Sequence, residues 1–116
     1  RQGMVSTQAE DRKRVATFEG WKLEVVRREL RDPEDVLVDL TSGEFDLLAA
    51  LIDRPNRLMT RDLLLDITKG RQADVFDRSI DITISRLRQK IEDDPKNPQF
   101  IKTVRGKGYI FSAEIG

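Results

Sequence analysis

The segment spanning about residues 77–92 constrains the fold of this 116-residue chain more than any other part of the sequence. Apolar residues recur in it at helical spacing, and on a helical wheel four of them fall within one narrow sector: Ile80, Ile84, Leu87 and Ile91. The pattern predicts a helix of roughly four turns that buries this sector and stops at Asp94-Pro95. Because the acidic residues 92–94 oppose the helix dipole, we expect its C-terminal end to fray.

Two shorter helices are predicted before this segment. Thr41 and Glu44 form a capping box, in which the hydroxyl accepts from the third helical N–H and the carboxylate accepts from the N–H of the cap. The helix that starts there carries apolar residues at helical spacing until Pro55 interrupts the run. Thr60 can cap a second helix, which ends near Gly70.

Strand-like segments flank the three helices. Residues 15–38 contain short apolar runs separated by turn residues, which predicts a small antiparallel sheet. Residues 100–111 alternate β-branched and aromatic side chains around Arg105-Gly106-Lys107-Gly108, where two glycines supply the backbone freedom of a hairpin turn. The order of strands, three helices and hairpin is that of a winged helix-turn-helix, an α+β fold, with an extra sheet in front. Polar residues 1–14 lack an apolar period and are predicted to be a flexible linker, leaving residues 15–116 as one domain.

Composition excludes several classes of function. The chain has no cysteine and no histidine, which removes disulfides, thiolate or imidazole metal ligands and a histidine general base. No nucleophile elbow, phosphate-binding loop or calcium loop is present, so we expect no enzyme, no metal site and no cofactor, and we interpret the many carboxylates as a solvated face. The longest uncharged apolar run, residues 47–52, is far shorter than the ~20 residues that span a bilayer, so a cytoplasmic location is expected.

Charge is distributed unevenly along the chain although the formal net charge is zero. Residues 29–53 carry eight acids against Arg31 alone, whereas residues 96–111 carry four cations and no acid. A molecule with such a dipole can present its basic end to a polyanion such as DNA.

The helix predicted over residues 77–92 leaves its polar face free. That face holds Arg78, Ser79, Ile82, Arg86 and Gln89, with Thr83 and Lys90 at its edge. A guanidinium there can contact guanine, and a methyl group can contact thymine. The alternative is an ordinary amphipathic helix with a solvated charged side. The hairpin adds Arg105 and Lys107 at its tip. An arginine there could enter a narrow minor groove; the alternative is a turn whose polar residues only keep it soluble.

Four motifs in this order resemble a known family: Leu40-Thr41-x-x-Glu44-Phe45-x-Leu47-Leu48, Leu58-Met59-Thr60-Arg61-Asp62-Leu63, Arg78-Ser79-Ile80-Asp81-Ile82-x-Ile84-Ser85-Arg86-Leu87-Arg88-x-Lys90 and Ile101-x-Thr103-Val104-Arg105-Gly106-x-Gly108-Tyr109. Together they resemble the effector domain of OmpR/PhoB-type response regulators, over almost the whole span from Val15 to Phe111. The resemblance implies a four-stranded N-terminal sheet, a three-helix core and a C-terminal hairpin wing.

The resemblance also implies the DNA contacts. The third helix would enter the major groove through Arg78, Ser79, Ile82, Thr83 and Arg86, and Arg105 of the wing would reach the minor groove. We assign contacts with the DNA backbone to Arg88, Lys90 and Lys107. Two copies would bind direct-repeat half-sites of a promoter head to tail.

The implied partners extend beyond DNA. In the family the loop between the second and third helices contacts RNA polymerase; here it is the segment 68–76, with Lys69, Arg71 and Asp74, and its alternative is a plain connector. A receiver domain and a sensor histidine kinase are expected to control pairing, because nothing in this length supplies a receiver's acidic pocket. Two alternatives remain: a winged-helix module that binds an acidic protein, and the DNA-binding domain of a membrane-anchored regulator.

Overall fold

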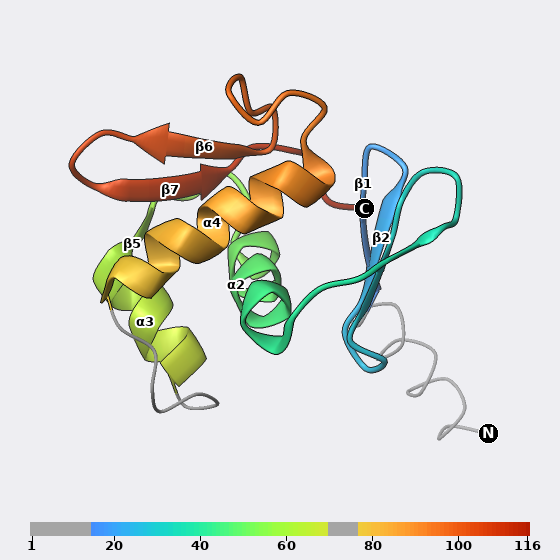
Figure 1. Ribbon diagram of the computed structural model, residues 1–116, viewed down its shortest axis with the longest axis horizontal. Coiled ribbons are helices and arrows are strands. Elements are labelled where there is room, and N and C mark those ends of the chain that lie inside the picture. The colour runs from blue at the N-terminus through green and yellow to red at the C-terminus, as the bar shows by residue number, and fades with distance from the viewer. Residues whose placement is uncertain (1–14, 70–76) are drawn as a thin grey trace.

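The computed structural model describes residues 15–69 and 77–116 and has the winged helix-turn-helix architecture (Figure 1). The expected linker, residues 1–14, lies outside the described residues. The elements run in the order β1 (Val15–Phe18), β2 (Trp21–Glu24), β3 (Glu29–Arg31), β4 (Leu37–Val38), α2 (Ser42–Asp53), β5 (Met59–Thr60), α3 (Arg61–Lys69), α4 (Asp77–Ile91), β6 (Ile101–Val104) and β7 (Gly108–Phe111). The predicted α+β class, the four-stranded N-terminal sheet, the three helices and the hairpin are confirmed.

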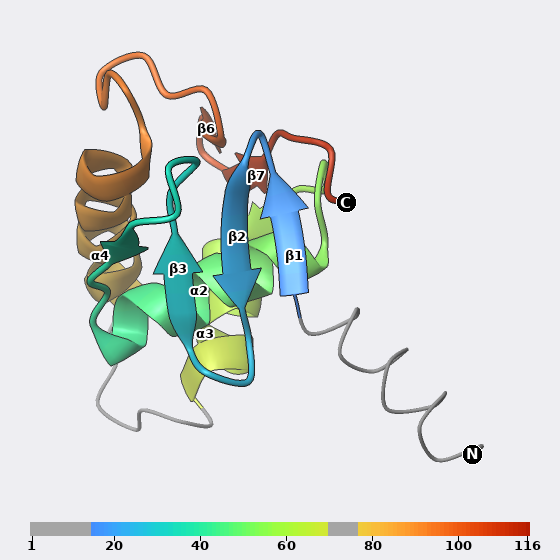
Figure 2. The same cartoon turned by 90° about the vertical axis from the view of Figure 1, so that its right-hand side faces the viewer.

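The N-terminal sheet is antiparallel in the order β1-β2-β3-β4 and lies in front of α2 in Figure 2. Its first turn has positive φ at both Glu19 and Gly20, as a tight two-residue hairpin requires. The free edge of β1 is covered by the end of the chain, because Thr17 and Gly116 exchange backbone hydrogen bonds of 3.3 and 2.8 Å. The sheet therefore joins the two ends of the described domain.

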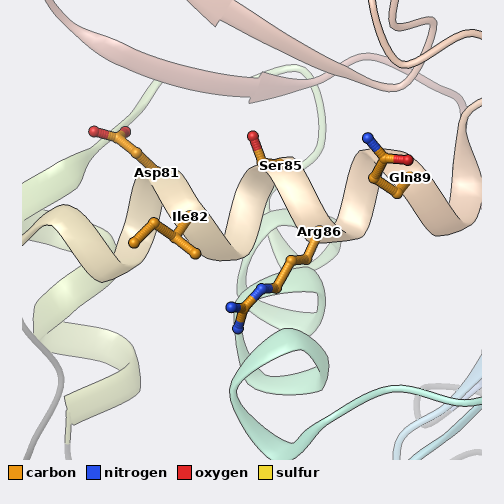
Figure 3. A pocket seen from close by; sticks show the side chains of 5 residues that line it. All are labelled: Asp81, Ile82, Ser85, Arg86 and Gln89. Carbon is orange, nitrogen blue, oxygen red and sulfur yellow. The ribbon is translucent and has the colours of Figure 1, made fainter.

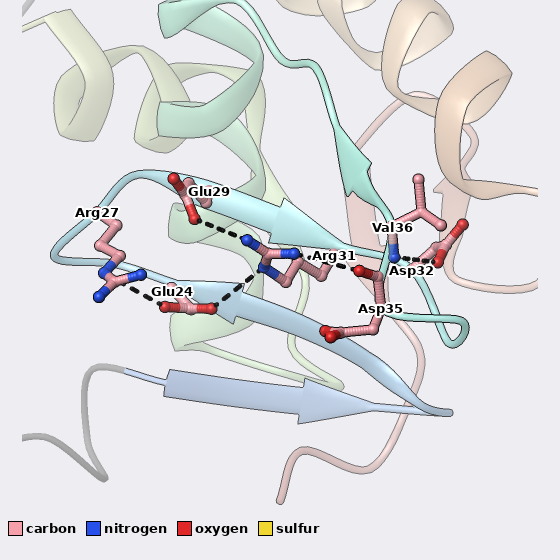
Figure 4. A network of polar contacts seen from close by, with 7 residues as sticks. All are labelled: Glu24, Arg27, Glu29, Arg31, Asp32, Asp35 and Val36. Carbon is pink, nitrogen blue, oxygen red and sulfur yellow. Dashed lines mark hydrogen bonds and ion pairs between the residues drawn. The ribbon is translucent and has the colours of Figure 1, made fainter.

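Residues 15–38, which form this sheet and its turns, carry six acids and four cations, and several of these are joined in ion pairs. Figure 4 shows Arg31 among the acids: its guanidinium is 3.7 Å from carboxylates of Glu24 and Glu29 and donates to the carbonyl of Asp35 at 3.1 Å. The Asp32 carboxylate accepts from two backbone N–H groups of the next turn, at 2.9 Å each. The sheet, which has two more acids than cations, and the basic β6–β7 turn lie at opposite ends of the view in Figure 1.

Local signals set the helix starts as predicted. The Thr41 hydroxyl accepts from Glu44 N at 3.2 Å and the Glu44 carboxylate accepts from Thr41 N at 3.0 Å, which completes the capping box of α2. The Thr60 hydroxyl accepts from Leu63 N at 3.1 Å at the start of α3. The four apolar residues of α4 are buried at 3 % exposure or less and form part of the core with α2, α3 and both sheets.

The wing contains a strand that the sequence analysis missed. The short β5 pairs with β7, so the wing is a three-stranded sheet in the order β5-β7-β6. Gly106 has φ +73° in the turn, as expected, but Gly108 has another role: a Cβ built there would lie 2.2 Å from the carbonyl oxygen of Met59. Gly108 thus permits the close approach of β5 to β7.

The expectation that the carboxylates form a solvated face was wrong for three of them. Glu92, just after α4, is buried, and its two oxygens accept from the N–H groups of Gln99, Phe100 and Ile101 at 2.6 to 3.2 Å. Glu44 and Asp46 of α2 are also buried, each beside a cation. In each case a partner distant in sequence compensates the cost of removing the carboxylate from water. The expected fraying at the end of α4 stays a prediction.

Candidate nucleic-acid interface

Three of the side chains that the sequence analysis proposed for reading bases lie in the described part of α4. Ile82 is 48 % exposed, Arg86 is exposed and Thr83 is half-buried. A shallow open depression of about 410 Å³ lies along the exposed face of this helix. Figure 3 shows the side chains that line it, which are Asp81, Ile82, Ser85, Arg86 and Gln89. Ser85 was not among the predicted contacts, although it lies one helical turn from Ile82 and so shares its face.

Arg78 and Ser79 lie in the first turn of α4, and their side chains are outside the described part of the structure. The predicted polymerase contacts are outside it as well: Lys69 ends α3 without a described side chain, and Arg71 and Asp74 fall in the segment 70–76. These assignments stay predictions.

The wing tip lies in the turn between β6 and β7, and both of its cations are exposed. Arg105 and Lys107 flank Gly106, and Lys107 N donates to the carbonyl of Val104 at 2.9 Å, which closes the turn. The turn projects at one end of the molecule beside the N-terminal half of α4 (Figure 1).

Arg88 connects α4 to the wing. Its Nε and Nη2 donate to the carbonyl of Ile101 at 3.0 and 2.7 Å, and Nη2 also donates to the Thr103 hydroxyl at 2.8 Å. These acceptors are neutral, so the positive charge of Arg88 is held in place without being neutralised by them.

Lys90 is engaged within the domain. Its ammonium lies 2.6 Å from Glu44 Oε1 and donates to the carbonyl of Asp39 at 2.8 Å. Burial alone would raise the pKa of Glu44, but the hydrogen bonds from Lys90 and from the Thr41 N–H outweigh it, and the pKa lies below its ordinary value. Because Lys90 balances this buried carboxylate, it has a role within the fold that does not depend on DNA.

A polar cluster that the sequence analysis did not find joins α3, α4 and the wing. The Asp81 carboxylate accepts from the Tyr109 hydroxyl and from Arg61 Nε, the latter at 2.9 Å. Burial acts to raise the pKa of Asp81, yet these two hydrogen bonds bring it below its ordinary value. Burial and the bond to Asp81 both raise the pKa of Tyr109. No local sequence signal points to this cluster, because its members lie 20 and 28 residues from Asp81.

The cations of the described residues fall into two groups. One group has a carboxylate within 4.0 Å and comprises Arg27, Arg28, Arg31, Arg61 and Lys90. Among residues 15–69 and 77–116, the cations of the other group have no carboxylate within 4.0 Å. Most of them lie on α4, on the wing or on the loop between them: Arg86, Arg88, Lys96, Lys102, Arg105 and Lys107. The others, Lys22, Arg54 and Arg57, lie elsewhere. The uncompensated positive charge is therefore concentrated around α4 and the wing.

Within the described ranges, no group of three or more acidic, histidine or cysteine side chains is arranged to hold a metal ion. No helix of that part of the chain is both long enough and apolar enough to cross a membrane.

Fold and charge together define a winged helix-turn-helix protein of the DNA-binding kind. A family model described as the C-terminal domain of transcriptional regulatory proteins matches residues 33–111. The chain belongs to this family and is a DNA-binding effector domain of the OmpR/PhoB response-regulator type.

Individual relatives agree with this assignment. The regulatory protein VirG of Agrobacterium fabrum is 46 % identical over 103 residues, which cover 89 % of this chain and 41 % of VirG. The crystal structure of the Klebsiella pneumoniae RstA DNA-binding domain in complex with the RstA box is similar with a TM-score of 0.74 and 38 % identity, over 84 % of this chain and 96 % of that one. The DNA-binding domain of CpxR from E. coli is similar with a TM-score of 0.71 and 30 % identity, over 84 % of this chain and 95 % of that one. The chain spans about two-fifths of the length of the VirG relatives.

Proposed function

We propose that this domain binds specific DNA sites by placing α4 in the major groove and the β6–β7 turn in the adjacent minor groove. The observation that carries the proposal is the concentration of uncompensated cations around α4 and the wing, next to an exposed row of side chains on the same helix. The similar RstA domain, whose structure is a complex with the RstA box, supports binding to a specific DNA site.

The proposed base contacts in the described part of α4 are Ile82, Thr83 and Arg86, with Ser85 added because it lines the same depression as Ile82 and Arg86. Arg78 and Ser79 are proposed as well, from their positions in the sequence. Arg86 is suited to a guanine, since its guanidinium has no carboxylate within 4.0 Å in the described structure. Arg105 enters the minor groove, and Arg88 and Lys107 contact the backbone. Lys90 serves the fold instead, through Glu44.

We further propose that two copies bind direct repeats in tandem. The net charge of the chain is zero, so the attraction of its cations to phosphates is offset by the repulsion of its acids. Tight binding therefore needs two paired copies. A receiver domain phosphorylated by a sensor histidine kinase in the cytoplasm would control that pairing, and the segment 68–76 would contact RNA polymerase.

Selection from random duplexes tests the core of this proposal. The domain is expected to enrich one motif that occurs twice in the same orientation, with half-site centres about one helical turn apart. A matched selection with Arg86→Ala, which removes a proposed base contact, should lose the preference at one or two positions of the motif. If the wild-type domain enriches no sequence, the proposed function is wrong, and an interaction with an acidic protein becomes the better interpretation.

A further inference from the structure

A second open depression, of about 410 Å³, lies between the loop that follows α4 and the start of β6. It is lined by Arg88, Pro95, Lys96, Asn97, Pro98, Lys102 and Thr103. Three of these side chains are cations and none is an acid. Neither Lys96 nor Lys102 had a role in the base-reading arrangement, so their presence in one depression requires its own explanation.

Charge at this place is not compensated. Within the described residues, no carboxylate lies within 4.0 Å of the charged nitrogens of Lys96, Lys102 or Arg88. The acids nearest in the sequence do not line the depression: Asp94 accepts from Lys96 N at 3.1 Å and Asn97 Nδ2 at 3.3 Å, Glu92 is buried against Phe100 N, and Asp93 is exposed beside them. The charged side chains that line the depression are therefore all cations.

Neutral groups of the depression are suited to an anion as well. The Thr103 hydroxyl accepts from Arg88 at 2.8 Å, which leaves its own proton to donate. Pro95 and Pro98 restrict the loop backbone, so that Lys96 stands on a segment with little freedom to lose on binding. A phosphate group combines the negative charge and the acceptor oxygens that this set of donors fits.

The position of the depression indicates which phosphate it would take. Arg88 is six residues beyond Ile82, which places it about 9 Å further along α4 than the middle of the base-reading face. The depression is open and shallow, as suits a phosphate of an extended polymer that passes over the surface.

We infer that Lys96 and Lys102, with Arg88 and the Thr103 hydroxyl, form a contact site for backbone phosphates of the DNA that flanks the bases read by α4. This inference rests on the proposed DNA binding and extends it to residues outside the helix face and the wing tip. Contacts of this kind add affinity that depends on salt and not on sequence.

The test compares the salt dependence of binding for the wild type and for Lys96→Gln/Lys102→Gln. Removing two phosphate contacts should reduce the slope of log K against log salt by about two, equally on the selected site and on a scrambled duplex. Lys22→Gln is the matched control, because Lys22 is also an exposed, uncompensated lysine but lies on β2. Its slope should equal that of the wild type. A double variant with the wild-type slope overturns the inference.

A second measurement separates a DNA phosphate from a free anion. Titration of the domain with inorganic phosphate, followed by the amide resonances of Lys96 and Thr103, should give only weak shifts without saturation. Saturation at about 1 mM or below, with no change of DNA salt slope in the double variant, would assign the site to a free ion and overturn the inference. Failure of the proposed function looks different: selection then yields no motif, while the slope difference can still be measured on any duplex.

Discussion

The ammonium of Lys90, near the C-terminal end of α4, lies 2.6 Å from the carboxylate of Glu44 in the first turn of α2. The Glu44 side chain is 3 % exposed and that of Lys90 is 33 % exposed. On another side of α4, Asp81 accepts from Tyr109 of the wing and from Arg61 of α3. The helix proposed to read DNA is thus fixed to its three neighbours by charged hydrogen bonds as well as by apolar packing.

Loss of the Lys90 ammonium should destabilise the domain. We expect Lys90→Ala to lower the free energy of unfolding by about 2–3 kcal/mol, somewhat less than for a fully buried pair, because Glu44 stays buried without its charged partner. Urea unfolding followed by the fluorescence of Trp21 measures this. The double variant Glu44→Gln/Lys90→Met should recover part of the loss, since neither charge then remains. Unchanged stability of Lys90→Ala would show that the pair contributes nothing.

Stability should fall in acid through the same pair. Burial acts to raise the pKa of Glu44, but the hydrogen bonds from Lys90 and Thr41 lower the pKa by more than burial raises it. The pKa in the folded state therefore lies below that in the unfolded state. Such a carboxyl stabilises the fold above its unfolded pKa of roughly 4.3, and this contribution disappears as the pH falls through the folded-state value. Unfolding free energies between about pH 3 and 6 should therefore decline toward low pH, and Glu44→Gln should flatten the decline. A variant with the wild-type slope would contradict this.

Tyr109 is the one tyrosine of the chain, so absorbance reports its ionisation directly. Burial and the hydrogen bond to Asp81 raise its pKa, and we expect a midpoint above the ordinary value of about 10. Asp81→Asn should lower the midpoint without restoring it fully, because burial remains. The unfolded chain ionises first, so stability conferred by this group is lost as the pH rises above about 10. Equal midpoints in the native and urea-unfolded protein would refute the expectation.

The two wing glycines should respond differently to alanine. At Gly106 the space is open and only the positive φ opposes a side chain, so we expect a loss of about 1–2 kcal/mol. At Gly108 the added Cβ would also meet the Met59 carbonyl at 2.2 Å, and Gly108→Ala should cost several kcal/mol and detach β5 from β7. Thermal unfolding of both variants compares them, and equal losses would count against the close approach.

Base contacts and backbone contacts should differ in their dependence on sequence. Arg86→Ala is expected to weaken binding to the selected site by about 1–3 kcal/mol and to relax the preference at one or two base pairs. Lys107→Gln should instead weaken binding to all duplexes alike and reduce the salt slope by about one. Equal losses for Arg86→Ala on selected and scrambled DNA would remove its proposed role.

Signals confined to a few neighbouring residues predicted most of the fold. The capping box of Thr41 and Glu44, the spacing of Ile80 and Ile84, and the glycine-rich turn are all local, and the structure contains each of them. What the sequence did not reveal depends on distant partners. Strand β5 has only two residues and exists by pairing with β7.

The same reasoning applies to the side chains of the candidate site. The burial of Glu92 was not expected, because the N–H groups that donate to its carboxylate follow it by seven to nine residues, across a loop. The ion pair of Lys90 with Glu44 was not expected, because the two residues are 46 positions apart in the sequence. A helical wheel identifies which side chains leave the core, but it cannot tell which of them meet a partner from another element.

The backbone pairing between Gly116 and Thr17 has a further consequence for the behaviour of the domain in concentrated solution. An uncovered strand at the edge of a sheet offers unpaired N–H and C=O groups to other copies and so promotes aggregation. Here the last residues of the chain occupy that edge beside β1, and Ile115 packs against the core. Removing residues 113–116 would leave the backbone N–H and C=O of Thr17 without these partners, and a strand of another copy could then pair with the edge of β1.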